Sequence, residues 1–203
     1  MKTLSEIDTT SKRATKGAGF SWGIAEEVGK NMRLLELFGL AGVKNLNKFL
    51  KDYKEKQFHK ITLISEINNA NKHPFCPIIL GTNFIDQVNL LDTKINIQIS
   101  NVAFPILFLP FVSRASEIIW KRIFLKIEEK EFLLNLNQSI YSNYLKNEIL
   151  EICNTVNISF IENNNSFNEN EWKELYKLSE DTFVEESESL KIGAAGAGLT
   201  DND

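Results

Sequence analysis

The sequence predicts a single α+β domain, in which a helical N-terminal part precedes a mixed or antiparallel sheet with flanking helices. Three observations lead to this fold class. Apolar residues recur at helical spacing in the first quarter of the chain, whereas apolar and polar side chains alternate over 94–100, the period of a half-buried strand. The 203 residues, 43% of them hydrophobic, are enough to bury a core. Helices that precede the strands, rather than alternating with them, favour α+β over a doubly wound sheet.

The helical part, 1–55, is expected to hold three short helices. The first covers 4–14 and ends at the glycines that follow, because glycine readily takes the left-handed conformation beyond a helix C-terminus. Ser21 is an N-cap residue for the second helix, whose apolar residues continue at steps of three and four to about Phe38. The third helix is predicted over 43–53. The chain therefore begins as helices joined by glycine turns.

The sheet-containing part, 56–192, is expected to hold strands and helices in mixed order. A continuous apolar run, 102–112, follows the alternating stretch and suits either a buried strand or a buried helix. We expect 95–111 to contribute central strands. Segments 123–127 and 132–136 flank a charged stretch and predict a hairpin. The remaining expected elements are one strand and three helices: 157–162, then 114–120, 141–153 and 171–178.

Charge is distributed unevenly along the chain. Residues 1–127 carry 18 basic and 11 acidic side chains, whereas 128–203 carry 5 and 16. A basic surface is typical of nucleic-acid-binding proteins, but here the lysines are spread singly and no aromatic–basic motif accompanies them. We therefore expect the two parts to pack together and predict no nucleic-acid partner.

The sequence shows no sign of a membrane or secreted protein. Its longest apolar run contains two prolines and is shorter than the roughly 20 residues that span a bilayer as a helix. The first residues lack the apolar stretch of a secretory signal, and the two cysteines form no CxxC pair. We therefore predict a cytoplasmic protein with no membrane association.

A glycine-rich turn, 16–23, is the first candidate ligand-binding site. Backbone N–H groups at the start of the helix that follows, with Lys16 beside them, stabilise an anion. Gly17, Gly19 and Trp22 complete the predicted group. The spacing is not that of a phosphate-binding loop or a dinucleotide fingerprint. The alternative is a tight corner between two helices, where glycine allows close approach of the backbones.

Two residues are candidates for catalysis. Glu27 lies at the edge of the core-facing side of the second helix, where it could act as a general acid or base or could pair with Arg13 or Lys16. Cys76 could be a nucleophile if a base lies nearby, or a buried and inert thiol. Two histidines are too few for a histidine-rich metal site, so no metal site is predicted. The reaction and the cofactor stay open.

The C-terminal segment, 193–203, is the second candidate site. Its glycines would let backbone N–H groups approach a ligand, and polar residues would complete the site. The predicted ligand-binding residues here are glycines and polar residues: Gly196, Gly198, Thr200, Asp201, Asn202 and Asp203. The alternative is a flexible tail, which is common at chain ends. The density of carboxylates at 201–203 suits a hard cation such as Mg²⁺ or Ca²⁺, or docking onto Lys16 and Arg13. Their charges complement those of Lys16 and Arg13, so we expect the two ends of the chain to come together.

The motif KGAGFSWGIAEE at 16–27 and the ending GAGLTDND resemble an uncharacterised bacterial family known only as a domain of unknown function. Proteins of that family look similar in opening with KGAG-x-x-WG-x-AEE and closing with GAG-x-TDND. The middle segments Cys76-Pro-Ile and Leu109-Pro-Phe also look similar to the family. The resemblance implies no activity, but it implies that the glycine-rich end is more than a casual tail.

Two functional hypotheses of different classes follow. The first is a cytoplasmic small-molecule enzyme or ligand-binding protein, whose site is formed by the two glycine-rich end motifs. The alternative is a non-catalytic accessory subunit or protein-interaction module, whose termini dock a partner protein, and a homo-oligomer is compatible with both. A deep pocket lined by both motifs would favour the first hypothesis, and a broad exposed apolar patch near them would favour the second.

Overall fold

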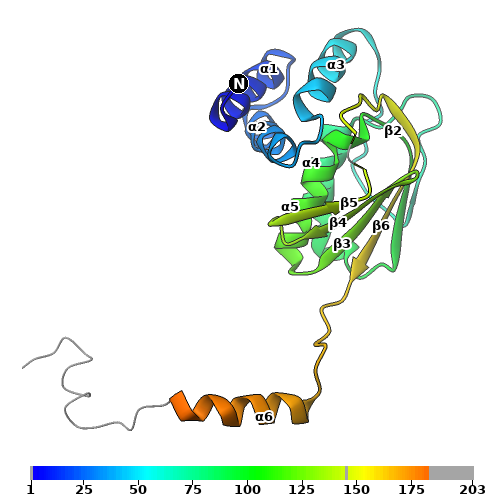
Figure 1. The fold of residues 1–203 in the computed structure, drawn as a ribbon. Helices are drawn as coiled ribbons and strands as arrows, with labels where there is room; N and C mark the ends of the chain where they lie inside the picture. The colour runs from blue at the N-terminus through cyan, green and yellow to red at the C-terminus, as the bar shows by residue number, and fades with distance from the viewer. Residues whose placement is uncertain (1, 145, 183–203) are drawn as a thin grey trace, which may run out of the picture. The chain divides into compact units, whose positions relative to one another are not determined.

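The computed structural model describes residues 2–144 and 146–182 (Figure 1). The chain divides into two units between Asn163 and Asn164, and each unit is described by itself. The first unit has helices in its N-terminal part, followed by a mixed sheet with flanking helices. The predicted fold class is therefore confirmed. The glycine- and alanine-rich segment 193–203 lies outside the described residues.

Three helices open the first unit: α1 (Leu4–Gly17), α2 (Trp22–Leu37) and α3 (Gly42–Glu55). Thr3 and Glu6 form a capping box at the start of α1, and the Ser21 hydroxyl accepts a hydrogen bond from the Ile24 N–H at the start of α2. Gly19, in the turn between these helices, has a φ of +100°, a backbone conformation that is unfavourable for residues with a side chain. All three predicted helices are confirmed.

Helices α1 and α2 approach each other closely at Gly29. A Cβ atom on Gly29 would lie 2.5 Å from Asp8 Oδ1 and 2.9 Å from the Asp8 carbonyl oxygen, so a side chain does not fit there. Helix α2 also buries Val28, Met32 and Leu35 in the core. A Cβ atom on the glycines of the turn itself, Gly17, Gly19 and Gly23, would meet no other atom within 4 Å, so the close approach lies at Gly29 and not at the glycine-rich turn.

The first unit also contains a six-stranded sheet, with the strand order β1-β2-β6-β3-β4-β5. Its strands are β1 (Ile67–Asn68), β2 (Asn96–Ala103), β3 (Arg122–Ile127), β4 (Lys130–Asn135), β5 (Ser139–Ser142) and β6 (Ile152–Ile161). β1 pairs with β2 in parallel, and the other pairs are antiparallel. The predicted hairpin is β3–β4, and the predicted strand near the end of the unit is β6. Because β6 lies between β2 and β3, the last strand completes the centre of the sheet.

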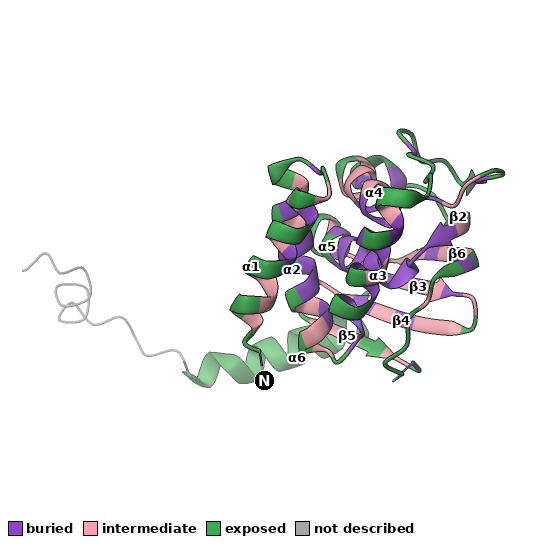
Figure 2. Cartoon of the chain, turned by 90° about the horizontal axis from the view of Figure 1, so that it is seen from above, coloured by how far each residue is buried: buried purple, intermediate pink, exposed green. Residues whose placement is uncertain are grey.

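The two faces of the sheet differ because side chains alternate along each strand. Ile97 of β2, Leu125 of β3 and Ile158 of β6 are fully buried on the face covered by α4 (Pro77–Leu91) and α5 (Leu109–Ile119). Figures 1 and 2 show these helices on one side of the sheet, with buried residues between the two layers. The residues that alternate with the buried ones point to the opposite face.

Helix α4 was not among the elements expected from the sequence. It begins at Pro77, a position where the missing proline N–H is not needed because the first helical N–H groups have no partner within the helix. It packs on α5 where Gly81 meets the ring of Phe111. Although α4 is apolar, neither it nor another helix in the described part of the chain is long and apolar enough to cross a membrane.

The apolar run after the alternating stretch changes conformation, which corrects the expectation that 95–111 contributes strands throughout. β2 ends just before Phe104, whose φ is +43°. A 3-10 turn, Pro105–Leu107, follows and leads into α5. Pro105 and Pro110 lack the N–H that a strand would donate to its neighbour, but both suit the first turn of a helix. The prolines therefore divide this run into a strand and a helix.

The helix predicted over 141–153 is wrong. The residues in front of β6, which begins at Ile152, have no regular secondary structure where they are described. Fully buried Asn45 of α3 holds this segment, because its Nδ2 donates to the Glu148 carbonyl oxygen at 3.1 Å and its Oδ1 accepts from the Leu150 N–H at 3.1 Å. These contacts with a distant helix override the local helical spacing.

The second unit contains α6 (Glu169–Ser179), where the helix over 171–178 was predicted. Asn168 and Glu171 form a capping box at its start. Phe167, just outside the helix, stacks on Trp172 in the first full turn, with ring centroids 5.5 Å apart. This contact is a hydrophobic staple, so local interactions alone define where α6 begins.

Replacement of Gly81 by alanine should destabilise the first unit. A Cβ atom at this position would lie only 2.2 Å from Cδ2 of Phe111, so α4 and α5 would have to move apart. Overpacking of this kind lowers the free energy of unfolding by about 1–3 kcal/mol. Urea unfolding monitored by circular dichroism measures the change.

Gly23→Ala in α2 is the matched control, because a Cβ atom on Gly23 meets no other atom within 4 Å. This substitution should leave the free energy of unfolding unchanged or raise it by up to about 1 kcal/mol, since alanine has the higher helix propensity. Equal stability of the Gly81→Ala and Gly23→Ala proteins would contradict the close packing of α4 on α5.

Candidate functional site

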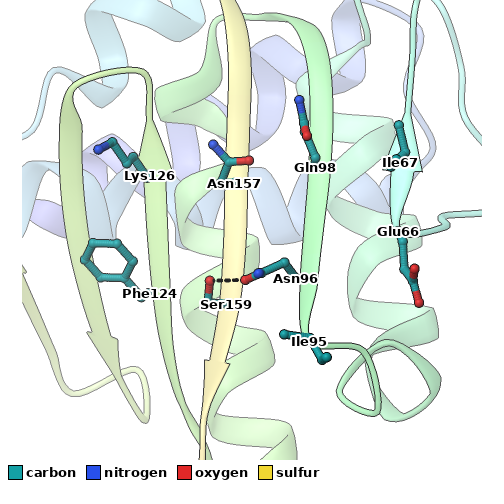
Figure 3. A pocket seen from close by; sticks show the side chains of 9 residues that line it. All are labelled: Glu66, Ile67, Ile95, Asn96, Gln98, Phe124, Lys126, Asn157 and Ser159. Atoms are coloured by element: carbon teal, nitrogen blue, oxygen red, sulfur yellow. Dashed lines mark hydrogen bonds between the residues drawn. The ribbon is translucent and has the colours of Figure 1, made fainter.

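A hollow of about 550 Å³ lies on the face of the sheet that α4 and α5 do not cover (Figure 3). Side chains of β2, β6 and β3 form its floor, and its edge is formed by the first residue of β1 with the residue before it, and by the residue before β2. Nine residues line it: Glu66, Ile67, Ile95, Asn96, Gln98, Phe124, Lys126, Asn157 and Ser159. The helices lie behind the sheet in this view, so these side chains point away from the core.

One cross-strand row in the floor places two amides beside an ammonium group. Gln98 of β2 is paired with Asn157 of β6, and Asn157 is paired with Lys126 of β3. Directly opposed residues have Cβ atoms about 4.5–5.5 Å apart, so one small molecule can contact all three side chains. In Figure 3, the amides of Gln98 and Asn157 make no hydrogen bond to the other residues drawn. Both amides are therefore available to a ligand.

A second cross-strand row combines polar and aromatic groups. Asn96 of β2 is paired with Ser159 of β6, and Ser159 is paired with Phe124 of β3. The Ser159 hydroxyl donates a hydrogen bond to Asn96 Oδ1, which leaves the two amide N–H groups of Asn96 as donors (Figure 3). The row therefore offers N–H donors at one end and an apolar ring at the other.

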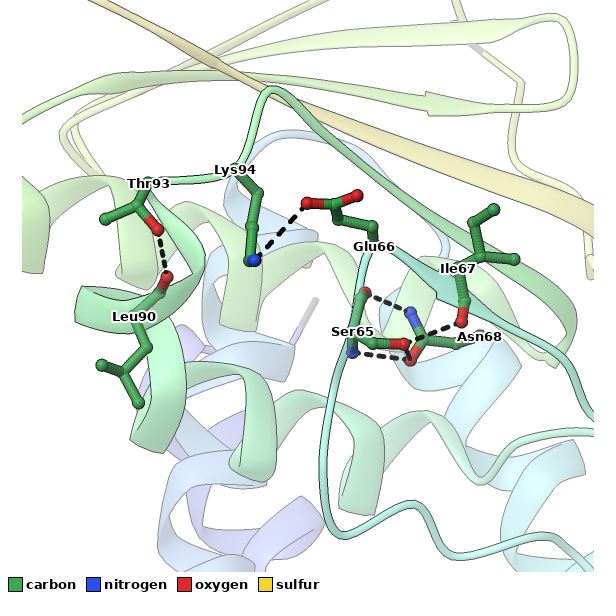
Figure 4. Close-up of polar contacts among 7 residues, drawn as sticks. All are labelled: Ser65, Glu66, Ile67, Asn68, Leu90, Thr93 and Lys94. Atoms are coloured by element: carbon green, nitrogen blue, oxygen red, sulfur yellow. Dashed lines mark hydrogen bonds and ion pairs between the residues drawn. The ribbon is translucent and has the colours of Figure 1, made fainter.

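A hydrogen-bonded turn holds Glu66 and Ile67 at the edge of the hollow (Figure 4). The buried Asn68 side chain accepts a hydrogen bond from the Ser65 N–H at 2.9 Å and donates to the Ser65 carbonyl oxygen at 2.7 Å. The same amide donates to the carbonyl oxygen of Gln98 at 3.2 Å. Asn68 therefore ties the short strand β1 to β2 and fixes the edge of the hollow.

The charged residues around the hollow are paired with opposite charges. Glu66 Oε1 lies 3.4 Å from Lys94 Nζ (Figure 4), and Lys126 Nζ lies 3.4 Å from Glu131 Oε1. Each exposed pair contributes little to stability, roughly 0–1 kcal/mol. Their main effect is to balance charge, so the hollow offers polar groups without a net charge that would attract ions.

The N-terminal members of the predicted ligand-binding group lie together at the corner between α1 and α2. Lys16 Nζ lies 5.4 Å from the ring centroid of Trp22, a cation–π contact, and the indole is 57% exposed. Gly17 ends α1, and Gly19 makes the turn. The Lys16 ammonium group thus already has an aromatic partner.

The C-terminal members of that group lie outside the described residues: Gly196, Gly198, Thr200, Asp201, Asn202 and Asp203. The meeting of the two chain ends therefore stays a prediction. Among residues 2–144 and 146–182, no three histidine, cysteine, aspartate or glutamate side chains lie close enough together to hold a metal ion.

Glu27 is the first candidate for catalysis. Its Oε1 lies 2.8 Å from Lys30 Nζ, one helical turn further along α2, and not beside Arg13 or Lys16 as considered from the sequence. Its side chain is partly exposed and faces a cleft between α2 and α5. The ion pair neutralises the carboxylate charge at the rim of that cleft.

Cys76, the second candidate for catalysis, lies in an environment that suppresses its reactivity. The residue is fully buried at the start of α4, and burial raises the pKa of its thiol to about 11. The other cysteine, Cys153 of β6, is also buried, and burial raises its pKa to about 12. Because the thiolate is the reactive form, these environments favour the alternative of buried, inert thiols.

Residues 2–76 match the model of a family described as "Protein of unknown function (DUF3726)". The expected similarity to a family of unknown function is therefore confirmed for this segment, which holds α1, α2, α3 and the glycine-rich turn. No curated protein and no solved structure matches the chain. The strands β2, β6 and β3, which form the floor of the hollow, lie beyond the matched segment.

The hollow itself was not predicted from the sequence, although the sequence does indicate some of the residues that line it. The alternation over 94–100 marks Asn96 and Gln98 as the outward-facing residues of one strand. Finding Asn157 and Ser159 beside them requires the knowledge that β6 pairs with β2. The site therefore depends on a pairing that is not encoded locally.

Both thiols should resist alkylation in the native protein. At pH 8, a thiol with a pKa of about 11 or 12 is almost entirely protonated, and burial also blocks the reagent. We expect no modification by iodoacetamide in native buffer, and modification of both cysteines after unfolding in guanidinium, as measured by mass spectrometry. Rapid labelling of native Cys76 would revive it as a candidate nucleophile.

Proposed function

We propose that this protein is a ligand-binding protein whose sheet hollow holds a neutral, hydroxyl-rich ligand of saccharide size. The observation that carries the proposal is the pair of cross-strand rows, which places three amides, a hydroxyl and a phenyl ring on one surface. The volume of about 550 Å³ lies within the range of about 300–1,000 Å³ that is typical of small-molecule sites.

The amide side chains support a ligand with hydroxyl groups. An amide presents two N–H donors and a carbonyl acceptor, and a hydroxyl group is both a donor and an acceptor, so the two form reciprocal hydrogen bonds. Gln98 and Asn157 lie directly opposite each other, so their amides can bind neighbouring hydroxyl groups on one ring. Asn96 adds further donors in the next row.

The apolar groups support a ligand with a C–H surface as well as hydroxyl groups. Phe124 lies in the floor, and Ile67 and Ile95 lie at the edge, where both isoleucines are largely exposed. A saccharide ring has polar edges and apolar faces, so it can pack a face on the phenyl ring while its hydroxyl groups reach the amides. The paired charges of Glu66 and Lys126 favour a neutral ligand over an ion.

Gln98→Ala and Asn157→Ala should each weaken saccharide binding about five- to tenfold, because one hydrogen bond to a neutral group contributes about 1 kcal/mol. Phe124→Ala should weaken it by a similar factor through the loss of ring packing. A panel of neutral mono- and disaccharides, screened by saturation-transfer NMR against the full chain, identifies the tightest binder for titration. All three side chains lie on the open sheet face, so their replacement should leave the fold intact.

Thr155→Ala is the matched control, since Thr155 lies on β6 but does not line the hollow. It should bind the chosen saccharide as the natural protein does. The proposal fails if no neutral saccharide binds at millimolar concentration, or if Thr155→Ala weakens binding as much as Asn157→Ala. The accessory-subunit alternative would instead be supported if the protein bound a defined partner protein and no saccharide, and if each of the three substitutions in the hollow abolished binding of that partner.

A further inference from the structure

A second cleft, of about 310 Å³, lies between α2, α5 and the turn that joins β4 to β5. Its polar lining consists of Glu27, Lys30, Asn31, Arg33, Arg114 and Asn137. This cleft is separate from the sheet hollow, with which it shares no lining residue. Two features, an unpartnered buried amide and an excess of cations, indicate what it binds.

The Asn31 side chain lines this cleft and is buried, with 7% of the residue exposed. Its Nδ2 is shielded from solvent and has no hydrogen-bond partner among the described residues. A buried amide without a partner is unfavourable, and native proteins rarely leave one unsatisfied. Because Nδ2 is a donor, the group that satisfies it must be an acceptor.

The charges around Asn31 favour an anionic acceptor. Lys30, Arg33 and Arg114 bring three positive charges to the cleft, and Glu27 brings one negative charge. Glu27 is paired with Lys30 at 2.8 Å. Within the described part of the chain, neither arginine forms an ion pair with a carboxylate. The cleft therefore carries two guanidinium groups available to a ligand.

The third wall of the cleft is held rigidly. Asn137 lies in the turn after β4 with a φ of +57°, and its Oδ1 accepts a hydrogen bond from the Ser113 hydroxyl of α5 at 3.0 Å. Its Nδ2 lies 3.4 Å from Glu117 Oε2, also on α5. These contacts fix the turn against α5, so the wall beside Arg114 is formed before a ligand arrives.

We propose that this cleft binds a phosphate group, as inorganic phosphate or as the end of a phosphate monoester. Two guanidinium groups supply paired N–H donors that match phosphate oxygens. A rotation of the Asn31 side chain would bring its Nδ2, which is shielded from solvent in the structure described, to the phosphate as a further donor. Lys30, Arg33 and Arg114 outnumber the carboxylates of Glu27 and of Glu117 beside Asn137, so the cleft keeps a positive charge that favours an anion. Leu34 and Leu37 also line the cleft and would pack against the organic part of an ester.

The test is a titration of the full chain with inorganic phosphate and with phenyl phosphate, followed by ¹H–¹⁵N NMR. Saturable binding should shift the side-chain amide signals of Asn31, assigned by their absence from the spectrum of the Asn31→Ser protein. Tighter binding of phenyl phosphate than of inorganic phosphate would indicate an ester, and equal binding would indicate free phosphate. An absence of saturation, or unshifted Asn31 signals, would overturn the proposal.

Three variants separate a built site from general charge attraction. Arg114→Gln should weaken phosphate binding at least fivefold, and Glu27→Gln should strengthen it because a repelling carboxylate is removed. Arg122→Gln is the control, since it removes the same charge from β3 outside the cleft; it should leave the dissociation constant within twofold. Equal weakening by Arg122→Gln and Arg114→Gln would overturn the proposal. Saccharide binding is independent of these outcomes.

Discussion

Burial of the inner face of the sheet under α4 and α5 is the constraint on which the rest of the structure depends. Phe111 of α5 can pack against α4 only because Gly81 has no side chain, and this close packing allows the two helices to cover β2, β3 and β4. Once the inner face is buried, alternation along each strand directs the intervening residues to the other face. The polar floor of the hollow is therefore a consequence of how the core is packed.

Secondary structure could be predicted from the sequence where neighbouring residues determine it. The predictions were wrong where contacts between distant parts of the chain determine the conformation. The start of α2 could be predicted because the capping side chain of Ser21 lies within the same turn. Helix α4 was not predicted because apolar residues lie on more than one of its sides. Ile78 and Phe84 are fully buried, and Ile79 and Ile85 also pack on the core. Apolar and polar residues therefore do not alternate with a clear helical period. The helix predicted over 141–153 is wrong because buried Asn45, far away in the sequence, binds the backbone of Glu148 and Leu150 in a non-helical segment.

The same distinction separates the predictable from the unpredictable parts of the candidate site. The alternation over 94–100 shows that Asn96 and Gln98 share a face, whatever lies beside them. Their neighbours on β6 could not be identified, because Ser159 lies 63 positions after Asn96 and nothing near either residue indicates the pairing. Cys76 was a candidate nucleophile because of its residue type alone. In the structure it is buried, and burial raises the pKa of its thiol, so its environment does not favour a catalytic role.

The insertion of β6 links the hollow to complete assembly of the sheet. β3 and β4 can pair early because a two-residue turn joins them, whereas β6 must close a long loop to reach β2. Asn45 assists this closure by fixing the chain immediately before β6. A ligand that contacts β2, β6 and β3 together binds only the sheet in which β6 is in place, so by mass action it stabilises the assembled state. Binding of the proposed ligand to the outer face would therefore be coupled to packing on the inner face through the same three strands.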